Sequence, residues 1–127
     1  MINKETKIQR QIQVGCSDLA VLFRTETGMF FQGKVNRNAN GSITITHAKP
    51  IKILVKGFSD LAGWRKSDGK FVGIEVKTKT GRATKEQKNF IKQVRKAGGL
   101  AGVARSVAEA RDIIKGDIDG RNGSEEL

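Results

Sequence analysis

The sequence lacks tyrosine altogether and has one histidine (His47), one cysteine (Cys16) and one proline in 127 residues. Without tyrosine, nucleases, topoisomerases and recombinases that use a tyrosine nucleophile are excluded. One histidine excludes a phosphodiesterase with a histidine pair, and one cysteine excludes an internal disulfide and a cysteine-cluster zinc site. If the chain cuts nucleic acid, the tools left to it are carboxylates, lysines and a divalent metal.

Long apolar runs are also absent: none approaches the ~18 residues of a membrane span, and the Met1 end has no apolar core of a signal peptide. A single unpaired cysteine suits a reducing compartment. We therefore expect a cytoplasmic protein.

Acidic residues are scarce, with 13 Asp and Glu against 24 Lys and Arg and a net charge of +11. Four of those acids and one arginine fall in residues 117–127, so residues 1–116 keep 23 basic and 9 acidic residues, a net charge of +14. A small domain with this excess repels itself unless it meets a polyanion, and nucleic acid is the commonest one. The charge predicts a nucleic-acid partner.

The length fits one domain, which we place over residues 1–116, with residues 117–127 as a disordered acidic tail. Hydrophobic periodicity and turn residues predict an α/β fold with a mixed sheet. The predicted helices cover residues 3–14, 84–97 and 106–116, and the predicted strands cover residues 19–24, 29–35, 42–47, 51–55, 71–78 and 100–105.

Local signals support these boundaries. Asn3 is a candidate N-cap of the first helix, Thr84 and Gln87 form a T-x-x-Q capping box, and Ser106 begins the last helix in an S-x-x-E pattern. The strands that flank the turn cluster of residues 36–42 predict a long hairpin. Because Ile43 and Ile45 look exposed on it, residues 29–48 are a candidate dimer arm or junction probe.

The chemistry is concentrated around Glu75 and Lys77. They are two residues apart on a strand, so both side chains leave the same face, with Cα atoms ~6.5–7 Å apart. Asp60 precedes them by one hairpin, and antiparallel pairing can bring it beside Glu75. Two carboxylates could hold Mg²⁺, and the lysine could stabilise the attacking hydroxide or the developing charge. The alternative is a solvated face with a cross-strand ion pair.

A near repeat provides an internal comparison. The segment GCSDLA around Asp18 almost duplicates GFSDLA around Asp60. No E-x-K strand follows Asp18 at hairpin distance, so we interpret Asp18 as a loop or cap residue.

Two helices add polar candidates. Glu5 lies within the apolar stripe of the first helix, where a metal or a basic partner would offset its burial; the alternative is a frayed helix start that favours an acid. Gln87 lies in the middle of the sheet-facing side of its helix, with Phe90, Ile91, Val94 and Ala97. It either caps the helix, or directs its amide at the site, or does both.

The opposite side of that helix is basic, with Lys85, Lys88, Lys92, Arg95 and Lys96. Such a side is commonly only solvated, but the charge of the chain favours phosphate contacts. Lys79, Arg82, Lys85 and Lys88 follow the candidate site and are the proposed DNA-backbone contacts. Phe58 and Trp64 are interpreted as core or rim packing.

Three patterns within residues 57–106 carry a family resemblance: GFSDLAGW, then IEVKT–GR–T–EQ–F, and a following GG–AGVA strand. With these patterns, the segment resembles the VRR-NUC family of the PD-(D/E)xK nucleases. It is most similar to the small stand-alone members of that family in phages and bacteria. The first helix and residues 23–28 fit more loosely. The resemblance implies a restriction-endonuclease-like core in the order α-β-β-β-α-β-α. Ser59 stands where the superfamily has proline, a residue that shapes the backbone and takes no part in the chemistry.

By this resemblance, Asp60, Glu75 and Lys77 are the catalytic set, Glu5 is the acid of the first helix and Gln87 the polar residue after E-x-K. It implies Mg²⁺ or Mn²⁺, for which we expect Asp60, Glu75 and the Val76 carbonyl as ligands, with Glu5 as a further candidate. It also implies a homodimer acting on branched DNA, as a Holliday-junction resolvase does, in the host cytoplasm if a phage encodes it. A non-catalytic DNA-binding module, and a nicking or restriction-like nuclease on linear duplex, are the alternatives.

Overall fold

The structure is a computed structural model that describes residues 3–25, 29–52 and 54–116. Contacts divide the chain into two compact units, Met1–Thr25 with Lys56–Leu127, and Glu26–Val55. The single domain that the sequence suggests over residues 1–116 stays a prediction, and the tail of residues 117–127 lies outside the described residues. Among the described helices, none has the length and apolar character needed to cross a bilayer.

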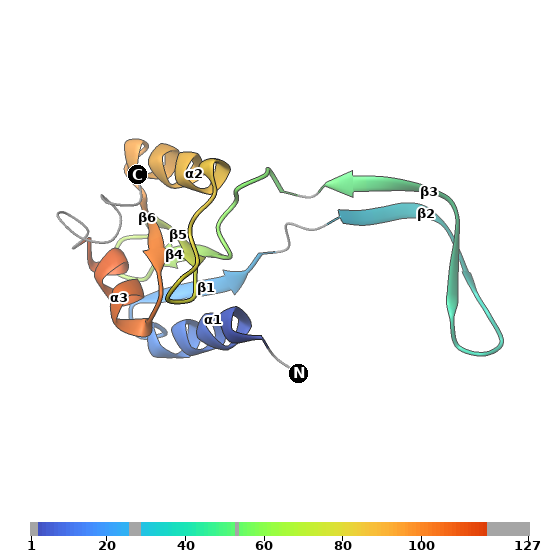
Figure 1. Ribbon diagram of the computed structural model, residues 1–127, viewed down its shortest axis with the longest axis horizontal. Helices are drawn as coiled ribbons and strands as arrows, with labels where there is room; N and C mark the ends of the chain where they lie inside the picture. The colour runs from blue at the N-terminus through green and yellow to red at the C-terminus, as the bar shows by residue number, and fades with distance from the viewer. Residues whose placement is uncertain (1–2, 26–28, 53, 117–127) are drawn as a thin grey trace. The chain divides into compact units, whose positions relative to one another are not determined.

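The described residues of the first unit form three helices and four strands (Figure 1). Asn3 caps the first helix by accepting a hydrogen bond from the Thr6 N–H, as its sequence predicts. The elements are α1 (Lys4–Gly15), β1 (Ala20–Arg24), β4 (Leu61–Arg65), β5 (Phe71–Val76), α2 (Lys85–Lys96), β6 (Leu100–Ala104) and α3 (Val107–Lys115).

The four strands form one mixed sheet in the order β1-β4-β5-β6. β1 with β4 and β4 with β5 pair antiparallel, whereas β5 and β6 pair parallel, with α2 as the crossover between them. This confirms the predicted α/β class, the mixed sheet and the order α-β-β-β-α-β-α, with the hairpin inserted after β1.

Helices cover both faces of this sheet (Figure 1). On one face, Val72, Ile74 and Val76 of β5 pack with residues of α1 and α3 such as Ile12 and Ile113. On the other face, Ile91 and Val94 of α2 pack against residues of β6. Because alternate residues of a strand point to opposite faces, Glu75 lies on the α2 side of β5.

The second unit is a two-stranded antiparallel ribbon of β2 (Met29–Arg37) and β3 (Ile43–Lys52), which confirms the predicted hairpin. The separate strand expected over residues 51–55 is wrong, because β3 continues through Pro50 to Lys52. In a ribbon of two strands each strand has a free edge, so a proline that cannot donate a hydrogen bond is tolerated.

Two residues of α2 lie differently from what the spacing of residues along an ideal helix predicts. Arg95, which this spacing places on the basic solvent side, is half-buried and donates from Nε to the Ala101 carbonyl at 2.8 Å. Its position at the border of the two sides lets the long side chain reach β6. Ala97, which the spacing places against the sheet, is exposed because it is the C-cap, beyond the last helical turn.

Candidate active site

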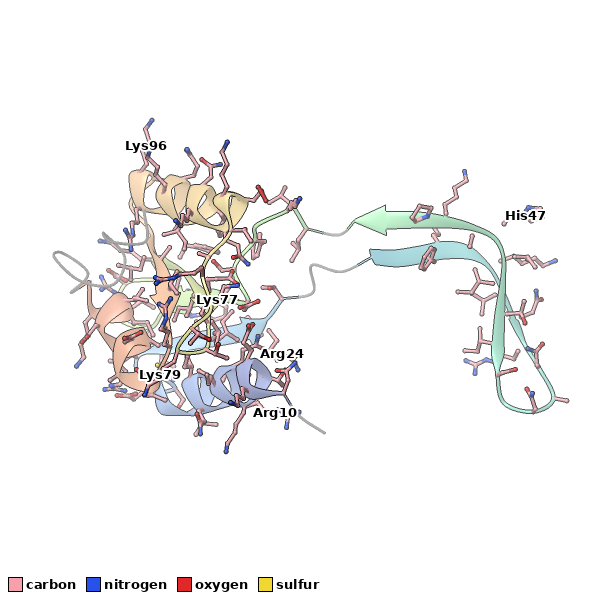
Figure 2. All side chains as sticks on the ribbon, viewed as in Figure 1. Arg10, Arg24, His47, Lys77, Lys79 and Lys96 are labelled. Atoms are coloured by element: carbon pink, nitrogen blue, oxygen red, sulfur yellow. The ribbon has the colours of Figure 1, made fainter. Side chains whose placement is uncertain are left out.

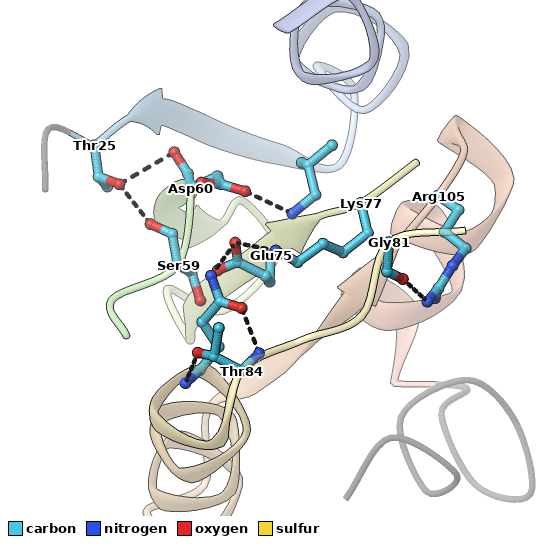
Figure 3. Close-up of polar contacts among 10 residues, drawn as sticks. Thr25, Ser59, Asp60, Glu75, Lys77, Gly81, Thr84 and Arg105 are labelled. Carbon is cyan, nitrogen blue, oxygen red and sulfur yellow. Dashed lines mark hydrogen bonds and ion pairs between the residues drawn. The ribbon is translucent and has the colours of Figure 1, made fainter. Parts of the chain in front are cut away.

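The register of β4 and β5 brings Asp60 and Glu75 together. Leu61 pairs with Ile74, so the residue before Leu61 lies opposite the residue after Ile74. Asp60 Oδ2 accepts a hydrogen bond of 2.9 Å from the Val76 N–H, one position further along β5 (Figure 3). The predicted convergence of the two carboxylates across this hairpin is therefore confirmed.

Thr25, the residue directly after β1, holds the backbone around Asp60 in place. The Thr25 hydroxyl lies within hydrogen-bond reach of the carbonyls of Ser59 and Asp60, and the Thr25 N–H donates to the Asp60 carbonyl at 2.9 Å (Figure 3). Sequence reasoning missed Thr25 because it belongs to no motif and lies 35 residues from Asp60. The one feature of the sequence that could have indicated Thr25 is its position directly after a predicted strand.

The same segment is also held against α2. Gly57 has a φ of +89°, a left-handed conformation that glycine adopts without strain, and a Cβ there would collide with the backbone of Glu86. The ring of Phe58 packs on Phe90 of α2, with centroids 4.6 Å apart. This confirms the packing role expected for Phe58 and fixes the approach of the chain to Asp60.

Glu75 is buried, with 1% of its surface exposed. Its Oε1 accepts a hydrogen bond from Gln87 Nε2 at 3.0 Å and lies 4.0 Å from Lys77 Nζ, while Oε2 has no hydrogen-bond donor among the described residues. Burial, hydrogen bonding with the Asp60 carboxyl and the charge of Asp60, in this order of size, together raise the pKa of Glu75 to about 9, against the lowering effect of Lys77. Without a cation, this environment favours the protonated form of Glu75.

Gln87 performs both of the roles that its position suggests. Its Oε1 accepts from the Thr84 N–H at 2.8 Å while the Thr84 hydroxyl accepts from the Gln87 N–H, which completes the capping box at the start of α2. Its amide nitrogen is thereby left to donate to Glu75. The cap thus fixes which end of the amide points into the site.

Glu5 belongs to the same region of the unit. It lies in the first turn of α1 and lines a cavity of about 380 Å³ with Asn3, Lys4 and Thr78. Its charge is the smallest of the causes that raise the pKa of Glu75, after those of Asp60. Glu5 is therefore close enough to act electrostatically on the site.

Basic side chains line two cavities of the first unit. Lys79 lines a cavity of about 480 Å³ with Lys4, Lys7 and Arg105, and Arg105 donates from Nη2 to the Gly81 carbonyl at 2.7 Å. Lys85 and Lys88 line a second cavity, of about 430 Å³, with Asn89 and Lys92 on α2. Arg82 is exposed in the loop between β5 and α2.

Figure 2 shows that the lysines differ in position. Lys77 lies within the first unit, whereas Lys96 points outward at the end of α2. The side chain of Lys77 is 13% exposed. Sequence reasoning did not single out Lys4 and Lys7, although a helix whose first turns carry lysines beside Glu5 offered that signal.

Asp18 takes no part in this site. It lies between α1 and β1, where Arg111 of α3 binds both of its carboxylate oxygens at 2.7 and 3.1 Å. This ion pair lowers the pKa of Asp18. The interpretation of Asp18 as a loop residue is confirmed, and the near repeat GCSDLA is a structural segment.

The oxygen atoms of Asp60 and Glu75 have features of a cation-binding site. Glu75 Oε2 is a buried oxygen without a donor, beside a second carboxylate, and the nearby Lys77 ammonium gives only partial compensation. Within residues 3–25, 29–52 and 54–116, no group of three or more His, Cys, Asp or Glu side chains is arranged to hold a metal. Two carboxylates still suit Mg²⁺, which keeps several of its waters.

The comparison with protein families gives a match to the VRR-NUC domain over residues 35–108, more than half of the chain. The chain belongs to the VRR-NUC family. No curated protein matches it.

The VRR-NUC match covers Asp60, Glu75, Lys77 and Gln87, and leaves α1 with Glu5 outside. The family implies a nuclease of the PD-(D/E)xK type and DNA as its substrate. The observed fold, a mixed sheet with helices on both faces, is consistent with it.

Proposed function

We propose that the chain is a divalent-metal-dependent endodeoxyribonuclease that hydrolyses phosphodiester bonds in branched DNA, in the manner of a Holliday-junction resolvase. The observation that carries the proposal is the meeting of Asp60 and Glu75 across β4 and β5, with Lys77 Nζ 4.0 Å from the Glu75 carboxylate. Carboxylates, an ammonium group and a metal are the tools that this composition leaves for cutting DNA.

Mg²⁺ or Mn²⁺ would be held by Asp60, Glu75 and the Val76 carbonyl. Bound there, the ion would polarise the scissile phosphate and lower the pKa of a water. The chain's own contribution is to keep both carboxylates in place: Thr25 fixes the backbone of Asp60, and Gln87 fixes one oxygen of Glu75. The other oxygen of Glu75, which has no donor among the described residues, is the one left for the ion.

Lys77 supplies positive charge on the same face of β5. Its ammonium group is largely shielded from solvent, which strengthens its interaction with negative charge. It orients the attacking water and stabilises the charge that develops on the phosphate. Glu5, from α1, contributes a further acid through a water or as an additional ligand.

The basic cavities suggest how DNA approaches. Lys79 lines one cavity with Lys4 and Lys7 of α1, and Lys85 and Lys88 of α2 line the other. Phosphates on either side of the scissile bond would meet these lysines, and Arg82 is available from the loop between. A symmetrical cut of a four-way junction needs two active sites, and for this reason we propose a homodimer.

A cleavage assay tests the proposal. Labelled four-way junction, flap, nicked and linear DNA are incubated with the full chain and Mg²⁺ or Mn²⁺, beside Glu75→Gln, Asp60→Asn and Lys77→Ala. The matched control is Asp18→Asn, which makes the same change in the near-identical segment outside the site. We expect junction cutting by the wild type and Asp18→Asn, loss to background in both carboxylate variants, and a fall of about a hundredfold or more in Lys77→Ala.

The other outcomes identify the alternatives. A wild type that binds junction DNA but never cuts with either metal would mean a DNA-binding module that kept the fold. Preferential cutting of linear or nicked duplex would mean a nicking or restriction-like enzyme. If Glu75→Gln and Lys77→Ala cut as fast as the wild type, the site assignment is wrong.

A further inference from the structure

The β2–β3 hairpin presents an apolar side to solvent. Val35 pairs with Ile45, and Ile43 is two residues from Ile45, so the three side chains share one side of the ribbon. They are 58%, 40% and 54% exposed, in the same order. Exposed apolar patches of this kind mark interaction sites, and a lone two-stranded hairpin is only marginally stable in water. The hairpin is thus built for a partner.

The positive charge of the hairpin indicates which kind of partner it binds. Residues 29–52 contain four basic residues, Lys34, Arg37, Lys49 and Lys52, and no acid. The hairpin of a second copy would bring the same four charges against them, and the chain as a whole carries +11. A polyanion with apolar surface between its charges fits this combination, and DNA, with phosphates flanking sugars and base edges, is such a ligand.

The ribbon also has a suitable form. A two-stranded β-ribbon fits the major groove of DNA, and apolar side chains of other ribbons enter the minor groove or unstacked base steps. The register shifts between Gln32 and Lys34, where His47 and Ala48 of β3 lie opposite Gly33 of β2, and His47 has a φ of 55°. Bulges bend a ribbon, and Figure 1 shows the hairpin turning sharply about halfway along, at the position that Figure 2 labels His47.

Gly33 lies opposite the two bulged residues and close to the backbone of β3. A Cβ at Gly33 would press on the Cγ2 atom of Ile45 and on the Thr46 carbonyl. The glycine therefore allows Ile45 to lie over the backbone of β2, on the same side as Val35. A side chain at position 33 would therefore disturb both the bulge and the packing of Ile45.

We propose that the β2–β3 hairpin is a DNA-binding arm, in which Lys34, Arg37 and Lys49 contact phosphates while Val35, Ile43 and Ile45 pack on sugars and base edges in a groove. The inference rests on the proposed function only in taking DNA as the ligand. Its test is binding without cleavage, so it can fail while the nuclease activity stands.

The experiment uses the full chain, with EDTA present so that no DNA is cut. The apolar side is changed by Val35→Thr, Ile43→Thr and Ile45→Thr together, which keeps β-branched residues and so the strand preference. The matched control is Thr44→Ser with Thr46→Ser, on the other side of the ribbon. We expect the affinity for a labelled four-way junction to fall about tenfold or more in the first variant and to hold in the control.

A charge variant gives an independent measurement. Lys34→Gln with Arg37→Gln should lower the slope of log affinity against log salt by about 0.9 for each phosphate that the variant no longer neutralises. Circular dichroism and light scattering accompany each variant, to show that the sheet unit is folded and that the number of copies in the particle is unchanged.

Two results would overturn the proposal. Equal affinity of all variants and wild type would show that the hairpin does not touch DNA. A loss of affinity that accompanies dissociation into single chains would show that the apolar side joins copies of the protein. Binding that depends on the hairpin in a protein that never cuts would instead leave this inference standing and remove the nuclease proposal.

Discussion

Gln87 donates a hydrogen bond of 3.0 Å to Glu75 from the same amide whose oxygen caps α2. The helix start and the buried carboxylate are therefore oriented by one side chain. Because the oxygen of the amide serves the cap and its nitrogen serves Glu75, a substitution can remove one role and keep the other.

Gln87→Glu should keep the capping acceptor but lose the donor to Glu75 and add a negative charge beside it. We expect cutting to fall about ten- to a hundredfold, the range found for partners that orient metal ligands, with the thermal midpoint little changed. Thr84→Ala is the matched control, since it removes the cap at a cost of about 1 kcal/mol but leaves the amide donor. Equal cutting by Gln87→Glu and wild type would contradict the site role.

Thr25 is expected to position Asp60 through its hydroxyl. Thr25→Val keeps the shape but removes the donor to two carbonyls, at a cost of about 1 kcal/mol in the free energy of unfolding. We expect slower cutting, with rescue by Thr25→Ser, which restores the hydroxyl. Turnover and denaturant midpoints measured for both variants check this, and a valine variant that cuts at the wild-type rate would exclude a positioning role.

The metal-free protein should lose stability as the pH rises. The pKa of Glu75 is raised to about 9 in the folded chain, from an ordinary value of 4.5. Between these values the folded state holds a proton that the unfolded chain has released, so the free energy of unfolding falls with rising pH. Urea denaturation at pH 5, 7 and 9 in EDTA measures it. Glu75→Gln should show a flatter dependence, and a parallel dependence in both proteins would contradict the raised pKa.

The α1 lysines should contact the DNA backbone. Lys4→Ala with Lys7→Ala removes two charges from the cavity that Lys79 also lines, and should lower the salt slope of junction binding by up to about 1.8. The matched control is Lys70→Ala with Lys115→Ala, two exposed lysines before β5 and at the end of α3, away from the end of β5 that carries Glu75. Equal slopes for the two pairs would mean that α1 does not meet DNA.

The sequence predicts those features of the fold and the site that depend on short-range patterns. The E-x-K alternation of β5, the hairpin back to Asp60 and the capping box at Thr84 are all readable within about 30 residues, and the structure has each of them. Even the dual role of Gln87 follows from its angle on α2.

What could not be predicted depends on long-range or marginal contacts. Thr25 acts through one hydroxyl on backbone carbonyls that any sequence would supply, so no residue pattern reveals it. Arg95 lies at the border between two sides of α2, and its direction is decided by the Ala101 carbonyl of a later strand. The continuation of β3 through Pro50 depends on the ribbon having no third strand at that edge.

The most direct test of the central claim is the anomalous difference map of a crystal of the full chain soaked with Mn²⁺. The account predicts a peak between the carboxylates of Asp60 and Glu75, on the side of Oε2, that is absent from a Glu75→Gln crystal treated in the same way. A Mn²⁺ peak elsewhere, with none beside Asp60 and Glu75, would contradict it.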